Sequence, residues 1–154
     1  MLTSHTEDVN TRRLTLAAAI IIDDRYRLLL VRKRGSRWFM QAGGKIDRGE
    51  TPDAALTREI REELGVEIRH RVAIEVASAP AANEAGFDVE AHLFWAAIAG
   101  TPQATAEIEE IRWVTLEEAA SLDLAPLTRD AVLPLVREWR DRQDLPTRRP
   151  EPSS

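Results

Sequence analysis

Stretches of apolar residues separated by turn signals predict that strands make up much of this chain. Residues 14–22 are apolar and rich in β-branched side chains, and the polar residues 23–25 that follow favour a turn. Another apolar stretch comes after that turn, so we expect the first two strands to form a hairpin. The predicted strands cover residues 14–22, 27–31, 38–40, 66–77, 87–98 and 108–114.

The period of the pattern changes between residues 51 and 65, where it predicts a helix. Thr51 is a suitable N-cap, Pro52 suits the first helical turn, and Gly65 favours a stop. The residues between 54 and 64 are good helix formers throughout. We therefore expect a helix that begins after Thr51 and ends before Gly65.

Two more helices are expected in the last third of the chain. Thr115 and Glu118 form a capping-box pattern, which predicts a short helix. Residues 128–140 carry Val132 and Val136 on one stripe, as in an amphipathic helix. Strands and helices that do not alternate strictly predict an α/β domain in which helices flank a mixed sheet.

The length of 154 residues suits one domain, which the pattern assigns to residues 14–140. Residues 1–13 are polar and charged, so we expect a disordered or extended N-terminal segment. Residues 141–154 are charged and rich in proline, which predicts a frayed C-terminal tail.

Composition narrows the classes of function. The absence of cysteine excludes disulfides and thiolate metal sites and favours a cytoplasmic location. The chain begins with polar residues rather than a secretory signal, and its longest apolar run is about half a membrane span, so no membrane partner is expected. A net charge of −5 argues against a nucleic-acid polymer as partner but allows a small phosphorylated ligand beside a bound cation.

Three carboxylates share one face of the helix predicted between Thr51 and Gly65. Glu59, Glu62 and Glu63 stand at positions i, i+3 and i+4, where they repel one another unless a cation binds. Carboxylate oxygens are the ligands that Mg²⁺ and Mn²⁺ prefer. Arg58 can orient one of these carboxylates through its guanidinium group.

The residues before the helix suit a phosphate group. Gly43 and Gly44 allow a close approach of the backbone, and Lys45 adds a positive charge. Glu50 can reach the carboxylate face from the loop side. Arg37, in the basic loop of residues 32–37, is a further phosphate candidate, with a solvated surface position as its alternative.

Each of these features has an ordinary explanation when it is taken alone. A helix rich in Glu and Arg is usually a solvated face, and a Gly-Gly pair is usually a turn. The complete spacing is different, because seven specified positions coincide by chance in roughly one of 10⁸ placements at average residue usage. The spacing therefore favours a functional site.

Residues 44–66, GKIDRGETPDAALTREIREELGV, resemble the Nudix box at all of its fixed and aliphatic positions. The order of the predicted elements, from the first strand to the last helix, is also similar to a Nudix domain. The resemblance implies the Nudix α/β/α sandwich, with the box as a loop-helix-loop. It also implies Mg²⁺-dependent hydrolysis, with Mn²⁺ as a substitute, of a nucleoside diphosphate linked to another group.

The same resemblance implies roles for individual residues. Glu59, Glu62 and Glu63 match the positions of metal ligands, Arg58 matches an orienting arginine, and Glu50 matches a supporting carboxylate.

The general base stays open at this point. Glu62 or Glu63 could take the proton of the attacking water. Glu107 matches a position where related enzymes often have an additional acidic ligand or base, although it is equally expected as a surface residue before an edge strand.

The resemblance extends to the substrate less specifically. Residues 39–45 are similar to the strand that enters the box in MutT-like nucleoside triphosphate pyrophosphohydrolases, which often have proline where Ala42 stands. Thr128 stands where MutT has a base-reading asparagine, and a hydroxyl cannot offer the paired donor and acceptor of an amide. Asp130 is a second candidate for reading a purine edge, with a first-turn acid favoured by the helix dipole as the alternative. We expect a (d)NTP or oxidised (d)NTP to be cleaved to the monophosphate and pyrophosphate.

Two other functions stay open. Pro80, fifteen residues after Gly65, lies near the position of a proline in an ADP-ribose subgroup, so ADP-ribose or another nucleotide sugar is an alternative substrate. A non-catalytic nucleotide-binding regulatory module is an alternative of another class, although the intact carboxylate set argues against it. Family relatives are often dimers, which leaves a homodimer open without any assembly signal in the sequence.

Overall fold

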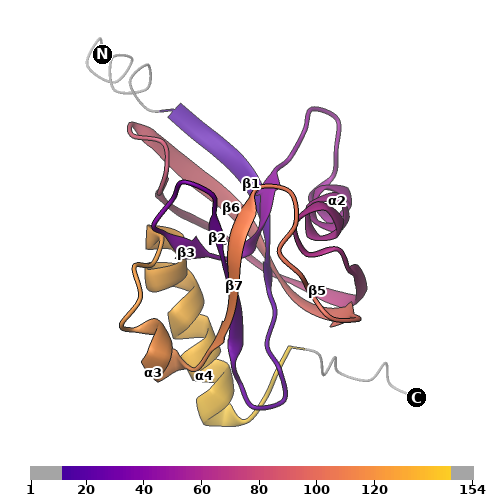
Figure 1. Cartoon of the computed structure of the whole chain (residues 1–154), viewed down its shortest axis with the longest axis vertical. Helices are drawn as coiled ribbons and strands as arrows, with labels where there is room; N and C mark the ends of the chain where they lie inside the picture. Colours follow the sequence, from indigo (N-terminus) through magenta and orange to yellow (C-terminus); the bar gives the residue numbers. More distant parts are fainter. Residues whose placement is uncertain (1–11, 147–154) are drawn as a thin grey trace.

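Seven strands form two sheets in the computed structural model, which describes residues 12–146. Strand β1 runs parallel to β6 and all the other paired strands are antiparallel, so the sheet structure is mixed, as predicted (Figure 1). The four-stranded sheet has the order β4-β1-β6-β5 and comprises β1 (Arg12–Ile20), β4 (Ala42–Lys45), β5 (Glu67–Pro80) and β6 (Phe87–Ala99). The three-stranded sheet has the order β3-β2-β7 and comprises β2 (Leu28–Lys33), β3 (Phe39–Met40) and β7 (Ile108–Val114).

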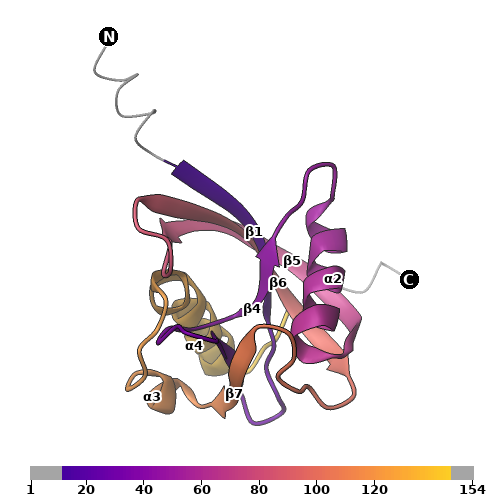
Figure 2. The same cartoon turned by 45° about the horizontal axis from the view of Figure 1, so that its top comes forward.

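Helices cover the sheets on two sides (Figure 2). Helix α2 (Pro52–Leu64) lies on one side, and α3 (Leu116–Ala119), the π-helical turn η1 (Thr128–Val132) and α4 (Leu133–Arg142) lie on the other. Successive side chains of a strand point to opposite faces. Ala17 and Ala19 accordingly belong to the apolar cluster under α2, whereas Ala18 and Ile20 belong to the cluster under α4. This is the expected α/β/α sandwich.

The bounds of α2 agree with the helix predicted from its local signals. The Thr51 hydroxyl accepts a hydrogen bond from the N–H of Ala54 (3.1 Å), and Pro52 occupies the first turn. Gly65 ends the helix in the left-handed conformation with φ of 69°. Three buried side chains, Leu56, Ile60 and Leu64, anchor α2 on the sheet.

The predicted hairpin between the first two strands forms only at its turn, beyond which the strands separate into different sheets. Strand β1 pairs with β4 and β6, whereas β2 pairs with β3 and β7 in the other sheet. One isolated bridge, between Ile22 and Leu28, joins the ends of the two strands at the turn. Both edges of β1 are filled by strands that come later in the chain, which a pattern of neighbouring residues cannot reveal.

The apolar segment before Gly43 is divided between the two sheets. Strand β3 pairs with β2 in the smaller sheet, and β4 pairs with β1 in the larger one. Gln41 is the single residue between β3 and β4. The backbone therefore crosses from one sheet to the other at Gln41, which buries this polar side chain between them.

The last helical segment begins with the wider η1 turn. The N–H of Leu133 bonds to the carbonyl of Thr128, and Pro134 has no N–H to continue the regular pattern. Helix α4 reaches Arg142 and so includes the first residues of the predicted tail. The predicted terminal segments otherwise fall largely on residues 1–11 and 147–154, outside the described residues. No helix between residues 12 and 146 is long and apolar enough to cross a membrane.

Candidate active site

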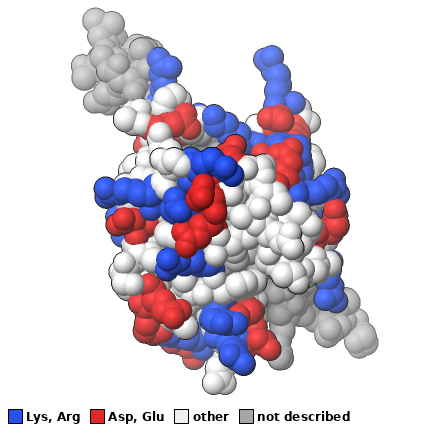
Figure 3. Space-filling view, in the orientation of Figure 1, with Lys and Arg blue, Asp and Glu red and all other residues white. Residues whose placement is uncertain are grey.

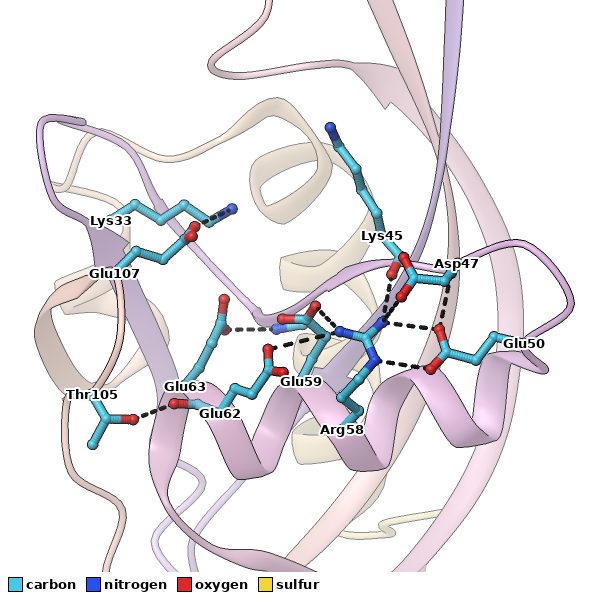
Figure 4. Close-up of polar contacts among 11 residues, drawn as sticks. Lys33, Lys45, Asp47, Glu50, Arg58, Glu59, Glu62, Glu63, Thr105 and Glu107 are labelled. Carbon is cyan, nitrogen blue, oxygen red and sulfur yellow. Dashed lines mark hydrogen bonds and ion pairs between the residues drawn. The ribbon is translucent and has the colours of Figure 1, made fainter.

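Arg58, in the middle of α2, organises the carboxylates around it (Figure 4). Its Nε and Nη2 donate to the two oxygens of Glu50 at 2.8 and 2.9 Å, which makes a bidentate pair. Its Nη1 donates to Glu59 at 2.7 Å, and Nη2 also donates to the carbonyl of Lys45 at 3.0 Å. One guanidinium group thus ties the helix to the loop that precedes it.

The pairing fixes the charge of these groups. The hydrogen bonds from Arg58, assisted by the N–H of Asp47, lower the pKa of Glu50 to about 2. The hydrogen bond to Glu50 likewise raises the pKa of Arg58 above its usual value. Glu50 and Arg58 therefore stay ionised across the neutral range and act as a fixed support.

Glu63 lies deepest among the carboxylates of the helix. Its side chain is 3% exposed, and its Oε1 accepts a hydrogen bond from the N–H of Gly43 at 3.0 Å. Burial raises the pKa of Glu63 to about 8; the Gly43 bond and Lys33 oppose the rise, and Glu59 and Glu107 add to it. Glu63 is a buried acid whose ionisation requires positive charge from elsewhere.

Glu59 packs directly on the backbone of Gly44. A Cβ atom at position 44 would lie 2.4 Å from the carboxyl carbon of Glu59, so only glycine leaves room for this carboxylate. Burial raises the pKa of Glu59 against the opposing effect of Arg58. Glu62, one turn further, is 54% exposed and lies 3.7 Å from Arg58.

Gly43 is required by the sheet rather than by the carboxylates. It pairs with Ala18 across β1 and β4 and has a φ of 150°. A Cβ atom at this position would lie 2.1 Å from the carbonyl oxygen of Ala17. The close approach of β4 to β1 directs the N–H of Gly43 toward Glu63, so the two glycines of the pair have separate tasks.

Glu107 and Lys33 form an ion pair at the C-terminal end of α2. Their Oε1 and Nζ atoms lie 3.3 Å apart, and Figure 4 shows the pair facing Glu63 and Glu62. The predicted site residue Glu107 is thus brought to the box carboxylates from the loop before β7. Lys33 has no predicted role from the sequence. Strands β2 and β7 pair irregularly between Arg32 and Lys33, and this irregularity has no local sequence signal.

A cleft with a volume of about 200 Å³ opens beside Gly43 and Gly44. Lys33 and Lys45 line the cleft together with the two glycines, and the loop of residues 80–84 forms one wall. The rest of the lining is largely apolar and includes Leu14, Leu16, Met40, Val89 and Leu127. A phosphorylated ligand with an apolar or aromatic body fits this division of charge.

Three other predicted residues lie outside the lining of the cleft. Arg37 stacks over Trp38 at 4.5 Å and is exposed. Asp130 is exposed and pairs with its neighbour Arg129 at 2.8 Å. Thr128 is fully buried, and its hydroxyl donates a 2.8 Å hydrogen bond to Oε1 of Gln41.

The donor set of the helix suits a hard divalent cation by its chemistry. Glu59 and Glu63 are acids with raised pKa values in a partly desolvated setting, and a cation would favour their ionised forms. Within residues 12–146, no three such side chains converge closely enough to enclose an ion. Arg58 holds Glu59 and Gly43 holds Glu63, so small side-chain rotations would be needed to bring them together.

One face of the molecule carries mixed charge. On the face shown in Figure 3, acidic and basic side chains of the described residues alternate rather than forming one basic band. Binding to a nucleic-acid backbone is favoured by such a band. The face in Figure 3 shows no such band of described residues.

Comparison of the sequence with known proteins finds one family along most of the chain. The NUDIX domain model matches residues 12–136. A protein of Bacillus subtilis (strain 168) named "Putative 8-oxo-dGTP diphosphatase" is 32% identical over 102 residues, or 64% of each chain. A Mycobacterium tuberculosis (H37Rv) protein named "Putative 8-oxo-dGTP diphosphatase 2" is 34% identical over 106 residues, or 66% of this chain and 70% of the relative. The chain thus spans less than two thirds of the Bacillus relative.

A solved structure shares the fold. The MutT NUDIX hydrolase from Burkholderia pseudomallei superposes with a TM-score of 0.66 at 24% identity, covering 82% of this chain and 97% of that chain. The likeness extends over nearly the whole of that protein.

Proposed function

Because the chain belongs to the NUDIX domain family, we propose that it hydrolyses the pyrophosphate linkage of a nucleoside diphosphate derivative. The substrate class is a (d)NTP or an oxidised (d)NTP, and the products are the monophosphate and pyrophosphate. Hydrolysis adds water across one P–O–P bond: the water oxygen bonds to phosphorus, the bridging bond breaks, and a carboxylate takes the proton.

One observation carries the proposal. Glu63 is a buried acid beside Glu59 on the same helix face, and its hydrogen-bond donor Gly43 also lines the cleft. The acidic face and the cleft meet at the Gly43-Gly44 backbone. A pyrophosphate group lying there would be within reach of Lys33 and Lys45.

Glu59, Glu62 and Glu63 are the residues that would hold Mg²⁺, or Mn²⁺ in its place, with Glu107 as an additional ligand. The cation would neutralise phosphate charge and make a bound water more acidic. The bidentate bond from Arg58 to Glu50 fixes the guanidinium group, which in turn orients Glu59. Arg58 and Glu50 are therefore proposed as supports of the ligand set.

Three carboxylates are available to accept the proton of the attacking water: Glu62, Glu63 and Glu107. Glu62 and Glu107 are the more exposed of these, with side-chain exposures of 54% and 64%. Glu63 is enclosed, which suits a ligand that must be held in place. The pH dependence of turnover for the three glutamine variants separates these roles, because only loss of the base removes the acidic limb of the profile.

The relatives support the nucleotide class of the substrate. The names of the Bacillus and Mycobacterium proteins refer to 8-oxo-dGTP, and their similarity to this chain exceeds 30% identity. The cleft adds independent support, because its apolar end suits a base and its basic end suits phosphates.

The test is product formation from a panel of dNTPs, 8-oxo-dGTP and ADP-ribose, with Mg²⁺ or with EDTA. We expect pyrophosphate and monophosphate with Mg²⁺ alone, and a loss of at least about 100-fold in Glu63→Gln. Glu117→Gln is the matched control and should retain activity, because Glu117 is exposed and pairs with Arg140 rather than with a residue of the site. Turnover that survives both EDTA and Glu63→Gln would refute the metal mechanism. Nucleotide binding without turnover would indicate a regulatory module.

Pro80 favours a nucleotide sugar as the second candidate substrate. This proline ends β5 and lines the cleft, so it is placed to contact a bound ligand. The same panel decides the ranking: ADP-ribose turning over faster than every triphosphate would favour the second candidate.

A further inference from the structure

The side chain of Gln41 is buried in the wall of the cleft, and its amide N–H group has no hydrogen-bond acceptor. Its side chain is 5% exposed and lines the cleft between Met40 and the glycine pair. Its Oε1 accepts the hydroxyl hydrogen of Thr128 at 2.8 Å. Its Nε2 has no hydrogen-bond partner in the structure.

An unused donor in this position is unfavourable in the free protein. A buried N–H without an acceptor costs about 1–3 kcal/mol, and most buried polar groups in proteins have partners. The neighbouring side chains that line the apolar end, such as Leu14, Leu16 and Leu127, offer no acceptor. A ligand in the cleft is the natural source of one.

The hydrogen bond with Thr128 shows which end of the Gln41 amide is unpaired in the structure. A side-chain amide carries a donor at Nε2 and an acceptor at Oε1. Thr128 is fully buried and its hydroxyl occupies Oε1, which leaves Nε2 as the free end. The pair therefore leaves an unpaired donor beside the cleft, and because Nε2 is itself buried, the amide would have to turn for a ligand to reach it. Thr128 itself acts through Gln41 rather than on the ligand.

We propose that Gln41, oriented by Thr128, is a specificity-determining residue that donates to an exocyclic carbonyl oxygen of the substrate base. The inference rests on the proposed nucleotide function and extends it to the class of base. Guanine and thymine present a carbonyl oxygen, whereas adenine and cytosine present an amino group at the corresponding place. A donor facing an amino group finds no acceptor there, so 6-oxopurine and 4-oxopyrimidine nucleotides bind better than their amino counterparts.

The size of the cleft agrees with a base as its occupant. Sites that enclose whole drug-sized ligands have volumes of about 300–1,000 Å³, and this cleft has about 200 Å³. The base alone would fill the apolar end, and the phosphates would extend past Gly43 and Gly44 toward the carboxylates of α2.

Binding of dGMP and dAMP by the full chain in EDTA tests the inference without hydrolysis. Calorimetry should show dGMP binding about tenfold or more tightly than dAMP, the scale of one satisfied hydrogen bond. Gln41→Leu should reduce this preference to within about threefold. Met40→Leu, an apolar exchange on the same wall, should keep it.

Two variants of Thr128 separate orientation from folding. Thr128→Ser retains the hydroxyl and should keep the preference for dGMP, whereas Thr128→Val removes the hydroxyl and should weaken it. The melting temperature of Gln41→Leu should fall, because the substitution leaves the buried Thr128 hydroxyl without its acceptor. If Gln41→Leu fails to fold, the Ser and Val variants still decide the outcome.

Three results would overturn the inference: equal binding of dGMP and dAMP, tighter binding of dAMP, or a preference that survives Gln41→Leu. Absence of binding by either monophosphate at millimolar concentration would also overturn it. Hydrolysis of triphosphates with Mg²⁺, measured separately, would then still support the proposed function. A protein that binds dGMP selectively but hydrolyses nothing would retain the role of Gln41 and lose the enzymatic role.

Discussion

Replacing Glu63 with glutamine should make the metal-free protein more stable while abolishing its activity. Glu63 is 3% exposed, and burial raises its pKa to about 8 from a usual value of 4.5. Glutamine keeps the shape and can still accept the hydrogen bond from the N–H of Gly43. It removes only the ability to ionise.

The sign of the effect follows from the direction of the pKa shift. Between pH 4.5 and pH 8 the folded protein binds more protons at Glu63 than the unfolded chain does, so the free energy of unfolding falls as the pH rises. At 1.36 kcal/mol for each pKa unit, the full shift from 4.5 to about 8 corresponds to about 5 kcal/mol above pH 8. At pH 7 the expected cost is about 3 kcal/mol.

Urea unfolding in EDTA at pH 5, 7 and 8.5 measures this difference. Glu63→Gln should be more stable than the wild type by an amount that grows with pH and reaches about 3 kcal/mol at pH 7. Glu62→Gln is the matched control, because Glu62 is 54% exposed and its removal should leave the pH dependence unchanged. Equal stability of wild type and Glu63→Gln at pH 8.5 would refute the account of a buried acid poised for a cation.

Four other substitutions test the supports of the site and the turn between β1 and β2. Gly43→Ala should destabilise the protein by at least about 2 kcal/mol in urea unfolding, because the added Cβ meets the backbone of β1. Gly44→Ala should fold but lose activity, because the added Cβ meets the movable end of the Glu59 side chain. Similar stabilities for the two variants would contradict this distinction. Arg58→Lys should fold normally and lower kcat at least about tenfold, because an ammonium group cannot reproduce the bidentate pairing with Glu50. An unchanged kcat in this variant would argue against a positioning role for Arg58. Hydrogen bonds from Arg27 and Arg25, acting against burial, hold the pKa of Asp23 below its usual value. Asp23→Asn should therefore cost about 1 kcal/mol at pH 7, and this difference should shrink as the pH falls through the lowered pKa. A difference that does not shrink on acidification would disagree.

The elements predicted correctly from the sequence are those specified by local signals. Helix α2 has its cap, its proline and its terminal glycine within fifteen residues, so its bounds could be predicted closely. The capping box of Thr115 and Glu118 also forms as predicted. The separation of the first two strands into different sheets could not be predicted, because the partners of β1 are decided by strands far along the chain.

In the candidate site, too, residues specified by local spacing could be predicted and residues placed by distant contacts could not. The box carboxylates and Arg58 follow from spacing on one helix, and the structure brings Glu50 and Glu107 to them. Gln41 and Lys33 received no role from the sequence, because each depends on an irregularity: a crossing between sheets for Gln41 and irregular strand pairing for Lys33. Thr128 was predicted to read the base, and its contact with Gln41 could not be foreseen from residues 87 positions apart.

Hydrolysis of one nucleoside triphosphate in H₂¹⁸O tests the central claim most directly. Mass spectrometry should find pyrophosphate and monophosphate in equal amounts, with one ¹⁸O atom incorporated per turnover into this pair. Incorporation should require Mg²⁺ and be lost in Glu63→Gln. Release of orthophosphate instead of pyrophosphate, or unchanged products in EDTA, would contradict the assignment of the α2 carboxylates to pyrophosphate hydrolysis.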